Sequence, residues 1–143
     1  MHTENLVAKA ETTINTSADK VWKALTDPKM IKEYMFGATV SSDWKKGSQI
    51  TWKGEMKGKT YEDKGEILEI VPKKKLKYTH FSPLSGLPDK SENYHTVTIA
   101  LEEEKNSTHV TLSQDKNNSE KSKNESEKNW NAMMESLKKV VEK

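Results

Sequence analysis

The sequence predicts an α+β fold in which a curved antiparallel sheet of about seven strands wraps around one long C-terminal helix, with two short helices after the first strand. Two observations lead to this prediction. From residue 38 to residue 114, apolar and polar side chains alternate between turn signals, as in an antiparallel meander. The end of the chain instead has apolar residues at helical spacing, and neither glycine nor proline follows Pro88. Because 143 residues is a common size for one domain, a single domain over residues 1–143 is expected.

The first elements are expected to be a strand and two short helices. β-branched residues between Ala8 and Thr16 favour a strand. Ser17 then offers a capping hydroxyl for a helix. Asp27 and Pro28 end that helix and begin a second one, because aspartate caps helices and proline is favoured in their first turn. Both segments carry apolar residues at the spacing of one helical face: Val21, Trp22, Leu25, Ile31, Tyr34 and Met35.

Six strands are expected between residues 38 and 114. The alternation breaks down over Gly65–Val71, where apolar side chains fall on both faces, and the two short helices are expected to cover the outer side of this segment. Ser82–Asp89 contains two prolines and a glycine and is predicted to be a loop. Its leucines, Leu84 and Leu87, indicate either a lid over a cavity mouth or ordinary local packing.

The C-terminal helix has the clearest pattern of the chain. Capping signals place its start either near Asn118–Glu120 or near Ser122–Glu125. A helix of roughly 20 to 25 residues would be ~30 to 37 Å long, enough to cross a small sheet. The apolar positions follow the spacing i, i+3, i+4 and i+7: Trp130, Met133, Met134, Leu137, Val140 and Val141.

Composition excludes several classes of protein. The 24 basic residues nearly balance 22 acidic ones and are all lysines, which lack the planar fork that reads guanine, so a nucleic-acid partner is not expected. The absence of cysteine excludes disulfides, thiolate zinc sites and cysteine nucleophiles. The N-terminus lacks a signal-peptide pattern, and no segment has the run of about 18 apolar residues that a membrane span requires. A cytoplasmic monomer or weak dimer is expected.

Motifs along nearly the whole chain resemble one known family. It is named after the C-terminal domain of the activator of heat-shock protein 90 ATPase, and it lies in the START and birch-pollen-allergen superfamily, whose fold is called helix-grip. The order of the motifs is more specific than any one of them. They are Ser17–Pro28, Gly65–Pro72 with Leu76–Tyr78, Thr96–Glu102, Thr108–Leu112, and Trp130 with Leu137, Lys138 and Glu142.

The resemblance implies an internal cavity between the concave face of the sheet and the long helix. Superfamily members use this cavity for lipids, sterols, polyketides and other apolar molecules. In the eukaryotic activators a separate N-terminal domain makes much of the chaperone contact, and 143 residues leave no room for it. Full activation of a chaperone ATPase is therefore not expected.

The strand alternation and the helical stripe predict which residues line this cavity. Apolar walls with a few polar groups are typical of ligand sites, although the same aromatic residues and methionines are also typical of an ordinary core. His80 and His95 fall on adjacent strands and are interpreted either as hydrogen-bonding groups for a ligand or as structural histidines. The predicted lining residues are Trp52, Met56, Tyr78, His80, His95, Val97, Trp130, Met133 and Leu137.

Neither catalysis nor a cofactor is expected. The histidines show no recognised metal-ligand spacing, so no metal site is predicted. Glu66 and Glu69 lie in an apolar strand, but no nucleophile motif, phosphate loop or dinucleotide fingerprint is present. The sequence therefore predicts a non-catalytic domain that binds a small apolar or amphipathic molecule. The rival hypothesis is a stress-related co-chaperone-like module that contacts a heat-shock chaperone through its lysine-rich surface and through exposed Leu84 and Leu87.

Overall fold

The computed structural model describes residues 6–35, 37–56, 58–83, 86–117 and 119–142. Seven strands and three α-helices follow one another in the order expected from the sequence. A 3₁₀ turn over Ser91–Asn93 lies in the loop before the sixth strand. The elements are β1 (Leu6–Ile14), α1 (Ala18–Thr26), α2 (Pro28–Tyr34), β2 (Thr39–Ser42), β3 (Gln49–Met56), β4 (Lys59–Val71), β5 (Lys75–His80), β6 (His95–Glu104), β7 (Ser107–Asn117) and α3 (Glu120–Val141).

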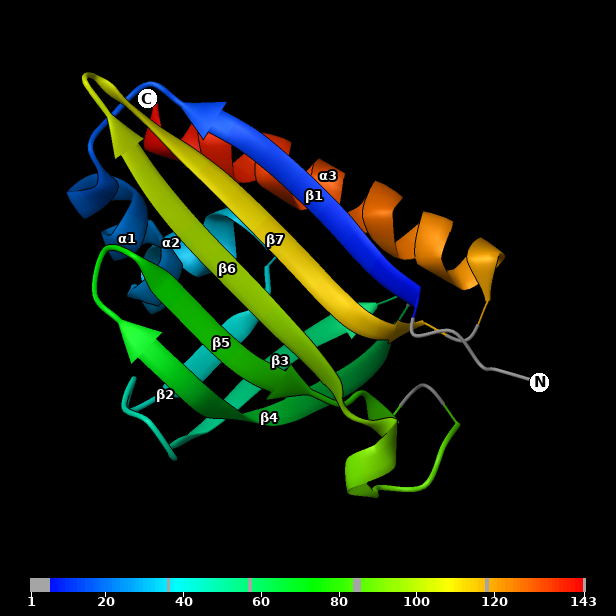
Figure 1. Ribbon diagram of the computed structural model, residues 1–143. Helices are drawn as coiled ribbons and strands as arrows, with labels where there is room; N and C mark the ends of the chain where they lie inside the picture. The colour runs from blue at the N-terminus through cyan, green and yellow to red at the C-terminus, as the bar shows by residue number, and fades with distance from the viewer. Residues whose placement is uncertain (1–5, 36, 57, 84–85, 118, 143) are drawn as a thin grey trace.

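The strands form one antiparallel sheet in the order β1-β7-β6-β5-β4-β3-β2. Figure 1 shows that the sheet is strongly curved and that all three helices lie on its concave side, behind the strands in this view. The α+β helix-grip architecture is thus confirmed, and the six strands expected between residues 38 and 114 are β2 to β7.

The two short helices begin where their capping residues predict. The Ser17 hydroxyl accepts from the Lys20 N–H at 3.4 Å, and an Asp27 carboxylate oxygen accepts from the Lys29 N–H at 3.0 Å. The first strand, however, runs over Leu6–Ile14 rather than from Ala8 to Thr16. The Thr16 N–H donates to the Ile14 carbonyl at 2.8 Å, which turns the chain towards α1.

The short helices do not cover the outer side of β4, so that expectation was wrong. They pack against α3 and against β2, β6 and β7 on the concave side. The outer face of β4 is flanked instead by Asp89, Ser91 and Tyr94, which line a hollow together with Leu68. The broken alternation has its own cause, because the register of β4 against β5 shifts between Ile67 and Glu69.

The core fills the space between the concave face of the sheet and the three helices. It joins alternate residues of the strands to the apolar stripes of the helices. The Tyr34 hydroxyl is satisfied within it, donating to the Ala24 carbonyl at 2.9 Å. The largest side chains that are almost completely buried are Ile14, Val21, Ile50, Ile67, Val97, Val110, Leu112, Met134 and Leu137.

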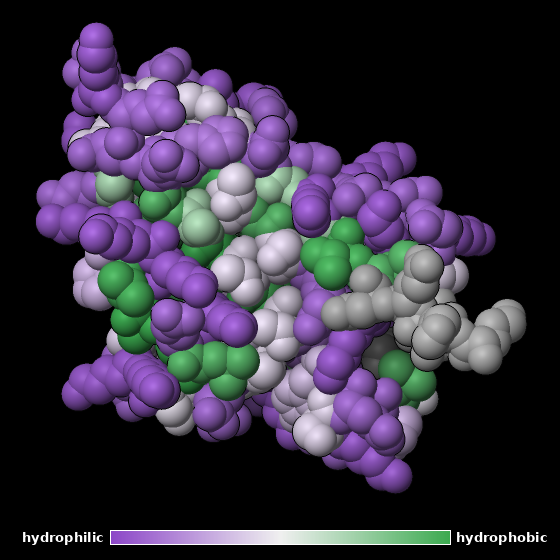
Figure 2. Space-filling view, in the orientation of Figure 1, coloured by the Kyte–Doolittle hydropathy of each residue, from purple (hydrophilic) through white to green (hydrophobic). Residues whose placement is uncertain are grey.

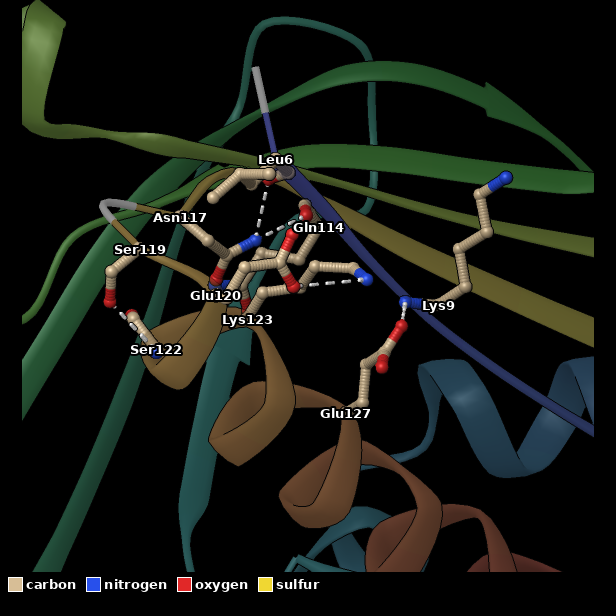
Figure 3. A network of polar contacts seen from close by, with 9 residues as sticks. All are labelled: Leu6, Lys9, Gln114, Asn117, Ser119, Glu120, Ser122, Lys123 and Glu127. Atoms are coloured by element: carbon tan, nitrogen blue, oxygen red, sulfur yellow. Dashed lines mark hydrogen bonds and ion pairs between the residues drawn. The ribbon is translucent and has the colours of Figure 1, made fainter. Parts of the chain in front are cut away.

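Helix α3 begins at the earlier of the two capping signals. The Ser119 hydroxyl accepts from the Ser122 N–H at 3.1 Å (Figure 3), and the helix then runs for 22 residues, ~33 Å. The preceding residue that the structure describes, Asn117, ties the start of the helix to the sheet. Its amide donates to the carbonyls of Leu6 at 2.8 Å and Gln114 at 3.0 Å.

Side chains of α3 bond to the edge of β1 that faces away from β7. The Glu127 carboxylate accepts from the Lys9 N–H at 2.9 Å, as Figure 3 shows. Near the other end of the helix, Lys138 donates to the Thr13 carbonyl at 2.8 Å, and the Glu142 carboxylate accepts from the Asn15 N–H at 2.8 Å. The helix is therefore fixed along β1 by polar contacts as well as by its apolar stripe. Within the described residues, no helix is both long and apolar enough to cross a membrane.

Candidate ligand-binding pocket

A pocket of about 470 Å³ lies between the concave face of the sheet and α3. Its volume is in the range of small-molecule sites, roughly 300 to 1,000 Å³. Strands β3, β4, β5 and β7 form one wall, the helix forms the other, and the end of α2 with the residues after it closes one side. The lining residues are Met35, Ala38, Trp52, Tyr61, Asp63, Tyr78, His80, Gln114, Ser126, Asn129, Trp130, Ala132 and Met133.

Aromatic side chains form much of the sheet wall. The ring of Trp52 lies 5.2 Å from that of Tyr78, between centroids, and 5.0 Å from that of His80, which it meets edge to face. Tyr61 stands opposite Gly54 in the β3–β4 ladder, and its ring lies over the glycine. The wall therefore presents flat apolar surfaces whose positions are fixed by contacts between rings.

Two pairs of polar groups interrupt the aromatic wall. The Nε2 atom of His80 lies 2.9 Å from an Asp63 carboxylate oxygen. The Trp130 indole N–H donates to the Gln114 side-chain carbonyl at 2.6 Å, which joins α3 to β7 across the pocket. The other Asp63 oxygen, Oδ1, is buried and has no hydrogen-bond partner among the described residues.

The structure brings five of the predicted lining residues to this pocket: Trp52, Tyr78, His80, Trp130 and Met133. Val97 and Leu137 are instead completely buried in the core. His95 pairs with His80 across β5 and β6, but its Nδ1 lies 2.9 Å from the Asp115 carbonyl and it does not line the pocket. The side chain of Met56 lies outside the described residues. That these residues bind a ligand stays a prediction.

Sequence reasoning missed the residues that β4 contributes, Tyr61 and Asp63. A signal was available, because the turn signal Lys57-Gly58 in the sequence predicts a two-residue hairpin turn. Such a turn pairs Met56 with Lys59 and therefore Trp52 with Asp63, as the structure has them. The other lining residues that it missed are Met35, Ala38, Gln114, Ser126, Asn129 and Ala132. Alternation alone does not show how far the ends of a helix and a curved sheet approach one another, so these residues needed the structure.

Burial raises the pKa of the Tyr78 hydroxyl well above its ordinary value of 10.0. Because the folded-state pKa is the higher one, its contribution to stability is complete below about pH 10 and is lost as the pH rises further. Tyr78→Phe should therefore unfold less readily in alkali. Between pH 9 and pH 11 the unfolding free energy of the original protein should fall by about 1.4 kcal/mol more than that of the variant. Urea unfolding at the two pH values measures this difference, and equal losses in both proteins would contradict it.

Two further hollows lie on the outer face of the sheet. Figure 2 shows this face, where weakly polar and apolar residues lie between strongly hydrophilic rims. One hollow, of about 480 Å³, is lined by small side chains that include Thr98, Ala100 and Thr111. The other, of about 580 Å³, contains the ion pair between Lys64 and Asp89. Neither has the aromatic wall of the concave pocket, which is therefore the candidate site.

In the part of the chain that the structure describes, no three histidine, aspartate or glutamate side chains converge as a metal site would require. Two pairs of polar groups in the pocket are instead hydrogen-bonded, Asp63 with His80 and Gln114 with Trp130. This arrangement can orient a small molecule through a few hydrogen bonds while aromatic rings contact its apolar surface.

A curved antiparallel sheet that grips a long C-terminal helix defines the START-like helix-grip class of proteins. Within it, the chain belongs to the family described as activator of Hsp90 ATPase homolog 1-like protein, which it matches over residues 15–142. The resemblance inferred from the sequence motifs is thereby confirmed. A comparison with curated proteins gave no match.

Solved structures agree with this assignment. The solution structure of ChR145 from Cytophaga hutchinsonii is 56% identical, with 99% of this chain and 97% of that chain covered and a TM-score of 0.86. The Aha1 dimer from Colwellia psychrerythraea is 20% identical, with 95% and 96% covered and a TM-score of 0.73. CalU16 from Micromonospora echinospora is also 20% identical, with 99% and 87% covered and a TM-score of 0.71. The last two likenesses concern the fold alone.

Proposed function

We propose that this protein binds a small apolar or amphipathic molecule in the pocket between the sheet and α3. The observation that carries the proposal is the convergence of Trp52, Tyr78, Trp130 and Met133 around a space of about 470 Å³. Apolar walls with a small number of oriented polar groups are the usual composition of ligand sites. The ring contacts of Trp52 hold the wall in place before a ligand arrives, which lowers the entropic cost of binding.

The proposed role is binding without catalysis, in the cytoplasm. Each of the two polar pairs of the pocket is held by its own hydrogen bond, and such oriented groups suit recognition of a ligand's polar group. The absence of cysteine suits a reducing compartment. A single domain that acts as a monomer or weak dimer is sufficient for this role.

Thermal unfolding with a panel of sterols, flavonoids, isoprenoid quinones and fatty acids tests the proposal. A ligand at a hundred times its dissociation constant should stabilise the protein by about 2.7 kcal/mol, a rise in Tm of roughly 5 to 11 °C. Ala132 lines the pocket from an exposed position on α3, so Ala132→Trp should obstruct the pocket and abolish the rise. Ala100→Trp, on the outer face, is the matched control and should keep it.

A second candidate function is contact with a heat-shock chaperone, which the family's description favours. Lysines make up all 24 basic residues, and Leu87 of the loop Ser82–Asp89 is 45% exposed. Leu84, the other leucine of that loop, lies outside the described residues. A panel without any rise in Tm would overturn ligand binding and favour this function, for which association with the purified chaperone of the same cell is the measurement.

A further inference from the structure

We infer, on the basis of the proposed function, that the ligand is an amphipathic molecule with a neutral hydroxyl group. The hydroxyl binds at Asp63 and His80, and the apolar part of the ligand extends towards α2. The inference excludes fatty acids and other carboxylates, which an apolar pocket alone would admit.

The first observation is an acceptor that lacks a donor. The Asp63 side chain is 16% exposed, and its Oδ2 atom lies 2.9 Å from His80 Nε2. Its Oδ1 atom has no hydrogen-bond partner among the described residues and is buried. A buried acceptor without a donor costs free energy, and a ligand that supplies the donor recovers it. Rotation of the carboxylate about its soft terminal torsion lets either oxygen turn towards the pocket that Asp63 lines.

The neighbouring lysines do not neutralise Asp63, because they bond elsewhere. Lys64, the next residue, forms an ion pair with Asp89 on the outer face of the sheet. Lys53 lies 3.7 Å from Glu62. His80 is therefore the described partner of the Asp63 carboxylate, and the polar end of the pocket is a site for hydrogen-bond donors.

The opposite end of the pocket is apolar. A small inner void of about 20 Å³ is separated from the pocket by four residues that line both spaces: Met35, Trp52, Tyr78 and Met133. Along β5, Leu76 lines the void, Tyr78 lines both spaces and His80 lines the pocket. The pocket therefore has a direction, from the polar pair to the two methionines. Methionine side chains adapt to irregular shapes, so an apolar group can extend the space at this end.

The chemistry of the polar pair favours a hydroxyl over an amine or an acid. A hydroxyl donates and accepts, so one such group can bond to both Asp63 and His80. An ammonium group only donates, so it could not accept a hydrogen bond from the His80 ring, and a carboxylate would be repelled by Asp63. Both charged groups would also lose hydration on entering the aromatic wall.

Four probes that share a naphthalene ring test the inference: 2-naphthol, 2-methoxynaphthalene, 2-naphthoate and 2-naphthylmethylammonium. Binding is measured by nuclear magnetic resonance titration at pH 7, with the Trp130 indole N–H as the reporter inside the pocket. We expect 2-naphthol to bind about tenfold or more tightly than its methyl ether, since a hydrogen bond to a carboxylate contributes at least this factor. Naphthoate should bind weakest.

Asp63→Leu should abolish the preference for naphthol while the methyl ether still binds. Asp63→Asn, which keeps the shape and one acceptor, should reduce the preference to a few-fold. Glu62→Gln is the matched control, because Glu62 pairs with Lys53 and does not line the pocket, and it should keep the full preference.

The outcomes separate this inference from the proposed function. Equal affinities for naphthol and its methyl ether would overturn the inference and leave the proposed function standing. Tightest binding of the ammonium probe or of naphthoate would overturn the hydroxyl in favour of an amine or an acid. Failure of all four probes to bind would overturn the inference, and together with a panel that gives no rise in Tm it would overturn the proposed function as well.

Discussion

Gly65→Ala is expected to prevent folding or to destabilise the protein by at least about 4 kcal/mol. A Cβ atom at this position would lie 1.6 Å from the carbonyl oxygen of Thr79 and 2.6 Å from its carbonyl carbon. These are backbone atoms of the neighbouring strand β5, and they are fixed locally. The Glu66 N–H donates to the Thr79 hydroxyl at 2.9 Å, and Lys64 and Phe81 exchange backbone hydrogen bonds of 3.0 and 2.8 Å.

Gly54→Ala is the matched control for this prediction. An added Cβ there would come within 2.5 to 2.8 Å of the ring end of Tyr61, a side chain that can turn away. We expect a loss of about 1 to 2 kcal/mol, from overpacking that is partly relieved. Far-ultraviolet circular dichroism and urea unfolding of both variants measure the difference. If both variants lost the same unfolding free energy, strands β4 and β5 could move apart to make room for the added Cβ atom, and the prediction would be contradicted.

Leu137→Ala should destabilise the protein by about 2 to 5 kcal/mol, the second large effect. Leu137 has no exposed surface, and it belongs to the stripe of α3 that packs into the core. Truncation leaves a cavity that the sheet cannot close, because its register is fixed by strands on both sides. Glu135→Ala, an exposed position on the same helix, should change the unfolding free energy by less than about 0.5 kcal/mol.

Ligand binding distinguishes the two roles considered for Leu137. The sequence placed it in the wall of the cavity, whereas the structure places it in the core, away from the pocket lining. At a temperature where the variant is folded, Leu137→Ala should therefore bind any pocket ligand with unchanged affinity. A large loss of affinity in the folded variant would show that the pocket reaches further along α3.

The architecture could be predicted because each element has its own local signal. Ser17 and Asp27 mark the starts of α1 and α2 through hydrogen bonds that the structure contains. The stripe from Trp130 to Leu137 indicates an amphipathic helix whatever it packs on. The break in alternation near Leu68 was visible but was explained wrongly, since a register shift and a covering helix leave the same pattern in the sequence.

The candidate site was harder to predict because it depends on distances between elements. Alternation places Trp52, Tyr78 and Val97 on one face, but the curvature of the sheet decides which of them reach a cavity and which pack in the core. The pairing of Asp63 with His80 joins two residues that are 17 positions apart on the adjacent strands β4 and β5, and it follows no motif. A polar pair of this kind becomes visible only when the register of the β4–β5 hairpin, with its shift, is known.

The bonds from α3 to β1 bear on how copies of the protein meet. An unpaired strand edge is a template for a strand of another molecule, but on β1 the exposed groups of Lys9 and Thr13 are already taken by Glu127 and Lys138. The other edge of the described sheet is β2, which has only four residues. Helix α3 thus serves as a substitute for an eighth strand. A molecule that lost this helix would expose the unpaired backbone groups of β1 to strands of other molecules. The same segment that closes the pocket therefore also protects the protein from aggregation through its sheet.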